Sequence, residues 1–175
     1  MAIRYDQLPE HLLPHAHILH APVDLAALTA QLGIRLVSRG DLPAKVGGFL
    51  YRGVLWDVIV VNAHHAAMRR RFTIAHEIGH WALAERGLFF NGVHAEDELE
   101  IERQMDAFAA ILLMPDELVK AAVQRSPSVP VLAKTFHVSP AAMKRRLSEL
   151  DLWLPDPDFD RCFASPFDDI PRDYI

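Results

Sequence analysis

The sequence predicts an α+β fold, with a small antiparallel or mixed sheet of about three strands and a helical core. Three short apolar runs bounded by glycine or asparagine precede residue 63, and two long segments with helical apolar spacing follow it. A linker with two prolines then separates this region from a small helix-turn-helix-like subdomain. Of the 175 residues, 51% are hydrophobic and 23% charged, which is enough apolar surface for an ordinary folded domain.

The N-terminal half is expected to begin with a helix that Asp24 caps and Gly33 ends. Gly53 indicates a tight turn between two antiparallel strands, and Asn62 closes the second of them. This second strand, VLWDVIVV, is nearly all apolar and is predicted to be the most buried. The expected helix and three strands cover residues 23–32, 34–37, 47–52 and 54–61.

The C-terminal half is expected to be helical. Gly87 is a natural stop for the first long helix, Pro115 breaks the second, and Asp116 is expected to cap a short third helix. Ser139 and Pro140 have the positions of a cap and first residue in the last helix. The five expected helices cover residues 66–86, 98–113, 117–124, 131–136 and 140–150.

These elements divide the chain into four parts. We expect a core domain over residues 23–125, a helix-turn-helix-like subdomain over 126–152, and an acidic, proline-rich tail over 153–175. The preceding arm, 1–22, is interpreted as a surface segment, although its histidines offer a weak metal-binding alternative: His11, His15, His17 and His20.

Charge and composition narrow the function. The formal charge of −5 argues against bare nucleic acid as the main partner. The single cysteine, Cys162, excludes an internal disulfide and a cysteine-rich zinc module. We expect a soluble cytoplasmic protein, because the N-terminus lacks a signal pattern and no window approaches 18 uninterrupted apolar residues. Ten histidines make histidine chemistry the first to consider.

The motif H-E-I-G-H at residues 76–80 is the sharpest signal in the chain. His76 and His80 lie one helical turn apart, so both imidazoles can reach one ion. Glu77 points about 100° around the helix and can contact a metal-bound water. The small residues Ala75 and Gly79 leave room beside the ion. The alternative is a pair of core histidines that only form hydrogen bonds.

A third ligand is expected on the segment AEDELEIERQMD. Glu102 has the best geometry, because Asp106 follows one turn later and can hold a ligating histidine through its free N–H. Glu98 is the second choice, and His94 is a nitrogen alternative. The remaining carboxylates are expected to be solvated: Glu96 and Glu100.

With FTIAHEIGHWALAE followed by IERQMDAFAAILLMP, the chain resembles the ImmA/IrrE family of metallopeptidases over roughly residues 23–152. The resemblance implies a gluzincin-like site with His76, His80 and Glu102 as zinc ligands, Glu77 as general base and Asp106 as support. Manganese is an alternative metal. Members of the family are cytoplasmic proteases that cut a helix-turn-helix repressor to switch on stress or mobile-element genes. One departure is Met105, where the family usually has a small residue, so the ligand helix is expected to pack differently.

The segment LAKTFHVSPAAMKRRLSEL has helix-turn-helix spacing, with Lys144, Arg145 and Arg146 on its second helix. In the ImmA/IrrE family such a unit accompanies the protease domain, and we favour a structural or repressor-docking role over DNA binding. The competing interpretation of the whole chain is a DNA-binding or toxin–antitoxin-type partner protein with a structural metal. A metal-dependent hydrolase of a non-peptide substrate is a further alternative.

Three further features have two interpretations each. The basic run 69–71 is expected to be a solvated helix face rather than a contact for acidic substrate. Asn62 ends a strand that either offers an edge to an extended substrate or simply turns. The group that stabilises the oxyanion is not identified by the sequence, and Tyr51 and His94 are candidates only.

Overall fold

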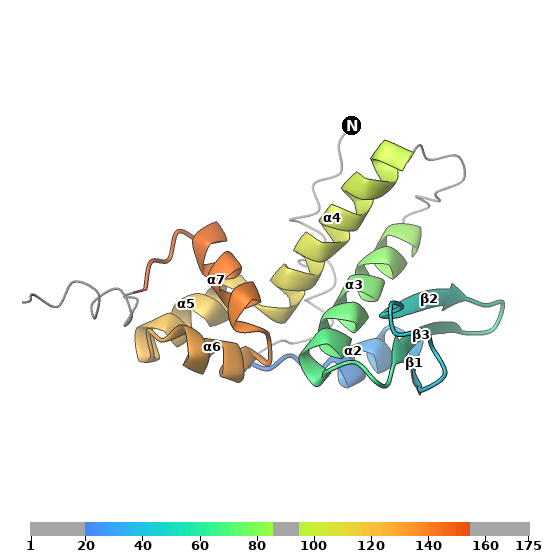
Figure 1. Ribbon diagram of the computed structural model, residues 1–175, viewed down its shortest axis with the longest axis horizontal. Coiled ribbons are helices and arrows are strands. Elements are labelled where there is room, and N and C mark those ends of the chain that lie inside the picture. The colour runs from blue at the N-terminus through green and yellow to red at the C-terminus, as the bar shows by residue number, and fades with distance from the viewer. Residues whose placement is uncertain (1–19, 86–94, 155–175) are drawn as a thin grey trace, which may run out of the picture.

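The computed structural model describes residues 20–85 and 95–154, and its α+β architecture agrees with the prediction. The sheet lies against α3, α4 runs beside α3, and three shorter helices follow beyond the end of α4 (Figure 1). The elements in chain order are α2 (Leu25–Gln31), β1 (Ile34–Arg39), β2 (Gly48–Arg52), β3 (Asp57–Asn62), α3 (Ala67–Glu85), α4 (Ala95–Leu113), α5 (Asp116–Arg125), α6 (Val129–Phe136) and α7 (Pro140–Glu149).

The sheet is mixed, with strand order β1–β3–β2. β1 pairs parallel with β3, and β2 pairs antiparallel with β3. Ile59 and Val61 of β3 expose 0% and 4% of their surface, so the central strand is the most buried, as predicted. Its predicted start at residue 54 is wrong, however. Val54, Leu55 and Trp56 lie in the exposed turn before the strand.

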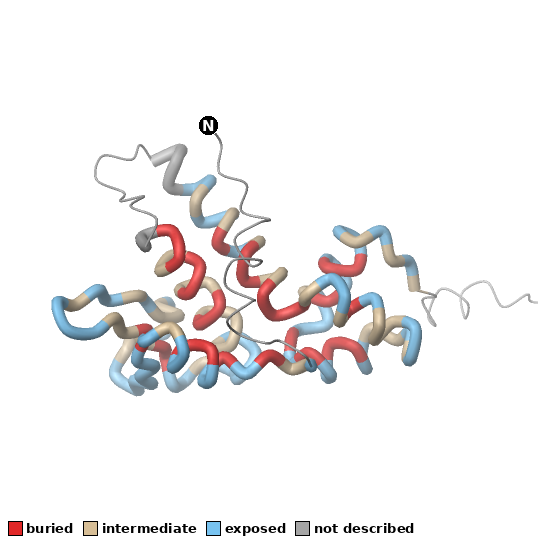
Figure 2. Tube along the Cα trace, turned by 180° about the vertical axis from the view of Figure 1, so that it is seen from behind, coloured by how far each residue is buried: buried red, intermediate tan, exposed pale blue. Residues whose placement is uncertain are grey.

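A large part of the core lies between α3 and α4, where Figure 2 shows buried segments recurring along each helix. Met105 and Phe108 of α4 are fully buried and pack over Gly79 of α3. The sheet supplies the other side of the core through its α3-facing residues. Both long helices can form because neither contains proline, and each carries apolar residues on one face.

Local capping signals account for the ends of the shorter helices. The Asp24 carboxylate accepts hydrogen bonds from two N–H groups of the first turn of α2, and the Ser139 hydroxyl accepts one in α7, both as predicted. Asp116 does not cap α5, because Pro115 occupies that position and the carboxylate instead pairs with Arg146. α6 begins two residues earlier than predicted.

Some predictions lie outside the described residues, namely the tail beyond 154 and His11, His15 and His17 of the arm. His20 is described and exposed. Among the described residues, no helix is long and apolar enough to cross a membrane.

Candidate metal centre

Helix α3 presents His76 and His80 on the side that faces α4. Both rings are mostly buried, with 15% and 20% of their side-chain surface exposed. The residues between them that face inward, Ile78 and Gly79, are fully or almost fully enclosed by the core. The packing of α3 therefore fixes the two imidazoles one turn apart, in the arrangement that the four-residue spacing predicts.

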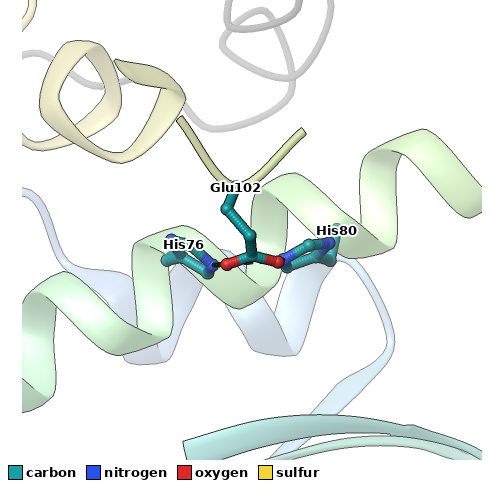
Figure 3. Close-up of side chains that lie close together, drawn as sticks. All are labelled: His76, His80 and Glu102. Atoms are coloured by element: carbon teal, nitrogen blue, oxygen red, sulfur yellow. Dashed lines mark hydrogen bonds and ion pairs between the residues drawn. The ribbon is translucent and has the colours of Figure 1, made fainter. Parts of the chain in front are cut away.

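Helix α4 brings Glu102 between the two histidines, as Figure 3 shows. The Glu102 carboxylate oxygens lie 3.2 Å from the Nε2 atom of His76 and 3.2 Å from the Nε2 atom of His80. The two Nε2 atoms are themselves 3.1 Å apart. His76, His80 and Glu102 thus form a group in which all three donor atoms lie within 4.8 Å of one another and could hold a metal ion.

The spacing of the two histidine nitrogens suits a tetrahedral zinc ion. Zinc–ligand distances of about 2.0–2.1 Å and tetrahedral angles place neighbouring donors about 3.3 Å apart. The 3.1 Å between the two Nε2 atoms is close to this value, and each Nε2 atom lies 3.2 Å from a different oxygen of the Glu102 carboxylate. Two imidazoles and one carboxylate also match the donor types of catalytic zinc sites, which keep a fourth position open.

Asp106 orients the first histidine. Its Oδ1 atom lies 2.9 Å from Nδ1 of His76, on the opposite side of the ring from Glu102. An Nδ1–H that donates to this carboxylate leaves Nε2 with its lone pair directed at the centre of the group. Burial, together with the neighbouring His76, lowers the pKa of His80, which favours the neutral form that binds metal.

Glu77 lies beside this group, next to β2. The backbone N–H of Leu50 lies near its carboxylate and favours the charged form. Burial raises the pKa of Glu77, and His76 and the Leu50 N–H oppose this effect without cancelling it. A carboxylate in such an environment is a better proton acceptor than an exposed one. Sequence reasoning missed Leu50, since a backbone N–H contributes through its position and leaves no residue-type signal.

The other predicted candidates lie elsewhere. Tyr51 alternates with Leu50 along β2, so its side chain lies on the sheet face opposite the core. It is therefore turned away from α3, and this position does not support Tyr51 as the oxyanion group. Glu100 is exposed and accepts a hydrogen bond from Gln104, as expected of a solvated carboxylate. The side chains of His94, Glu96 and Glu98 lie outside the described residues.

Asn62 has a structural role. β3 is the central strand, so it offers no free edge, and the edge interpretation of Asn62 is wrong. Its fully buried amide donates to the carbonyls of Pro43 and Val46 at 3.1 and 3.0 Å and accepts from the N–H of His64 at 3.0 Å. Asn62 therefore organises the loop between β1 and β2.

Two arginines, one from the basic run and one from the helix-turn-helix segment, have structural roles. Arg71 is half-buried and donates to the carbonyl of Val23 at 2.9 Å, so the solvated-face prediction fails for this residue of the basic run. Arg146 exposes only 5% of its surface, donates to the Met114 carbonyl at 3.0 Å and pairs with Asp116. It therefore joins α7 to the end of α4 and the start of α5.

Comparisons with known proteins identify the family of the chain. The family model Peptidase M78, described as the IrrE N-terminal-like domain, matches residues 29–148. The radiation response metalloprotease IrrE of Deinococcus radiodurans is 31% identical over 102 residues, which are 53% of this chain and 31% of that protein's length. A Mycobacterium tuberculosis transcriptional regulator shares the fold, with a TM-score of 0.66 and 18% identity over 82% of this chain and 46% of the other. The family match covers most of the chain, and the chain therefore belongs to the IrrE N-terminal-like family of M78 peptidases.

Proposed function

We propose that the chain is a zinc metalloendopeptidase that cleaves a helix-turn-helix repressor of the XRE type and thereby derepresses stress-response or mobile-element genes. The main support for this proposal is that His76, His80 and Glu102 lie close enough together to hold one metal ion, with Glu77 beside them. Membership of a metallopeptidase family and similarity to a radiation response metalloprotease support it.

In this proposal His76, His80 and Glu102 hold the metal. A bound zinc ion supplies Lewis acidity, which polarises a carbonyl and lowers the pKa of a water molecule toward about 7. Asp106 keeps His76 in the orientation and tautomer that this requires. Since sites with two histidines and a carboxylate accept several divalent ions, manganese is the alternative cofactor.

Glu77 carries the proton in the proposed reaction. Its carboxylate takes a proton from the attacking water as the new carbon–oxygen bond forms at the scissile carbonyl. The carbon–nitrogen bond then breaks, and Glu77 gives the proton to the leaving amine nitrogen. The immediate products are a carboxylic acid and an amine, so atoms and charge balance with one water consumed, and the acid proton then passes to the amine to give a carboxylate and an ammonium group.

The β2 edge suits an extended substrate. Hydrogen bonds from Gly53 N–H to Trp56 O and from Asn62 N–H to Gly47 O set the pairing register with β3. In that register the backbone groups of Gly48, Leu50 and Arg52 point away from β3. No other strand pairs with this edge in the described part of the chain. A peptide that adds to it in an antiparallel direction passes directly beside Glu77.

Metal stoichiometry tests the site. We expect one zinc per chain by native mass spectrometry after stripping and reloading the protein, and a marked loss in Glu102→Gln. Glu100→Gln is the matched control, because this exposed carboxylate lies on the same helix and its contacts with the described residues, Gln104 and Arg103, lie within that helix. Absence of stoichiometric zinc from the wild type would overturn the enzyme proposal, and equal zinc in Glu102→Gln would exclude Glu102 as a ligand.

Cleavage of the helix-turn-helix regulator encoded nearest to this chain tests the activity. Glu77→Gln is expected to keep zinc and fold, because a neutral amide suits a position where burial raises the pKa of the carboxyl. It is expected to lose cleavage by at least about a hundredfold, the usual contribution of general acid–base catalysis. If Glu77→Gln retained full function in cells, the alternative of a DNA-binding protein with a structural metal would replace the peptidase.

A further inference from the structure

The turn between β2 and β3 carries three apolar residues that the described chain leaves uncovered. Val54, Leu55 and Trp56 expose 104%, 81% and 53% of their surface, and we call them the hairpin tip. Figure 1 shows this turn at the end of the molecule farthest from α5, α6 and α7. Adjoining exposed apolar side chains are a feature of surfaces that contact another molecule.

Neighbouring residues hold the hairpin tip in place. The Gly53 N–H donates to the Trp56 carbonyl at 3.1 Å and closes the turn. The Arg35 guanidinium lies 3.9 Å from the centre of the Trp56 ring and covers one of its faces. At the base of the hairpin, the indole N–H of Trp81 donates to Asp57 at 2.8 Å and ties the hairpin to α3. The apolar surface is therefore ordered before any partner binds, which lowers the entropy cost of binding.

The hairpin tip is continuous with the candidate metal centre through β2. Leu50, whose N–H contacts Glu77, lies four residues before Val54 on the same strand and turn. Four extended residues span about 13 Å. Suppose that one residue of a bound peptide pairs with the β2 edge at Leu50. The residues of that peptide that lie three to five positions away, in the direction of Val54, then reach the tip.

We propose that the hairpin tip binds apolar side chains three to five residues on the N-terminal side of the peptide bond that is cleaved. This inference rests on the proposed function and adds a sequence preference to it. An antiparallel peptide on β2 runs from the tip toward Gly48, so the residues that precede the reacting bond pass the tip. The occupant is an extended substrate segment with two or more apolar residues at these positions.

Cleavage-site profiling tests the preference. Zinc-loaded wild type and the triple variant Val54→Ser/Leu55→Ser/Trp56→Ser digest a proteome-derived peptide library, and mass spectrometry identifies the new ends. We expect aliphatic and aromatic residues to be enriched three to five positions before the cut in the wild type, and this enrichment to vanish in the variant. The matched control is Val131→Ser/Trp153→Ser, which removes exposed apolar residues from the helical region.

Binding gives a second measurement that is independent of turnover. A peptide favoured by the wild type is titrated calorimetrically into Glu77→Gln with and without the triple substitution. Loss of the apolar contacts is expected to raise the Kd of the peptide about tenfold. This is the effect of exposing roughly 55 Å² of apolar surface to water that the complex would otherwise bury. The double control variant is expected to bind like Glu77→Gln alone.

The outcomes separate this inference from the proposed function. No cleavage by the zinc-loaded wild type would overturn both. Equal cleavage profiles and affinities for wild type and triple variant would overturn the inference alone, as would a preference confined to the C-terminal side of the cut. A triple variant that only loses self-association in sedimentation, with its cleavage profile unchanged, would show that the tip contacts a second copy and would also overturn it.

Discussion

Replacing Gly79 with alanine tests whether the contact between α3 and α4 sets the geometry of the metal centre. A Cβ at this position would lie 2.8 Å from the sulfur of Met105 and 2.9 Å from Cδ1 of Phe108. Ordinary van der Waals contact begins near 3.4 Å, so α4 or its side chains must move by about 0.5 Å. Met105 lies one turn after Glu102, and the movement is therefore transmitted to the carboxylate between the histidines.

The expected effect is the balance of two opposing changes. Glycine to alanine inside a helix favours folding by about 1 kcal/mol. Overpacking a buried contact disfavours it by about 1–3 kcal/mol. The net expectation for Gly79→Ala is a loss of about 1 kcal/mol, which lowers Tm by about 3 °C for a domain of this size. Disturbing the support of a metal ligand lowers metal affinity by about tenfold or more.

Calorimetric unfolding of the stripped protein and competitive zinc titration measure the two effects. Met105→Ala is expected to cost less stability in the Gly79→Ala background than in the wild type, because the new methyl group fills part of the space that the removed sulfur leaves. This double-mutant cycle should give a favourable coupling of about 1 kcal/mol. A Gly79→Ala protein with raised Tm and unchanged zinc affinity would refute the argument, since helix propensity alone would then account for the result.

Three further substitutions test structural roles that the sequence did not predict. Arg146→Met should lower the free energy of unfolding by about 2 kcal/mol in urea titration, because it removes the bonds to the Met114 carbonyl and Asp116. An unchanged midpoint of the titration would contradict the role of Arg146 in joining α7 to α4 and α5. Asn62→Ala should increase hydrogen exchange in the β1–β2 loop, and protection equal to wild type would disprove its organising role. His137 has φ of 53° at the end of α6, so His137→Gly should raise stability by about 0.5–1 kcal/mol, and a lower Tm would refute this.

The helices were predictable because their signals are local. Asp24 and Ser139 cap the helices that the sequence assigns to them, and Pro115 separates two helices as expected. The start of β3 was not predictable from periodicity, because Val54 and Leu55 belong to an apolar run that continues into a buried strand. The amino-acid type alone does not show whether an apolar residue lies in a turn or in a buried strand, and only the tertiary arrangement distinguishes the two.

The candidate site was predictable where spacing along one helix determines position. His76 and His80 lie together because α3 is helical, and Glu102 was the preferred third residue because it shares a face of its helix with Asp106. Tyr51 could not be assigned in the same way, since its direction depends on the strand register, which follows from pairing with β3. Backbone groups that contribute to the site, such as the Leu50 N–H, can be recognised only in the folded structure.

The proposed preference for a protein partner over DNA draws on the charges of the helical region. Sequence-independent DNA affinity depends on how many cations reach phosphates, and the basic cluster on α7 has only three. Arg146 is buried by its contacts with the ends of α4 and α5, and Arg145 pairs with Glu149 at 3.0 Å. This leaves Lys144 as the exposed member of the cluster with no carboxylate partner among the described ion pairs. The apolar hairpin tip, continuous with the edge strand beside Glu77, offers a surface of the kind that proteins recognise.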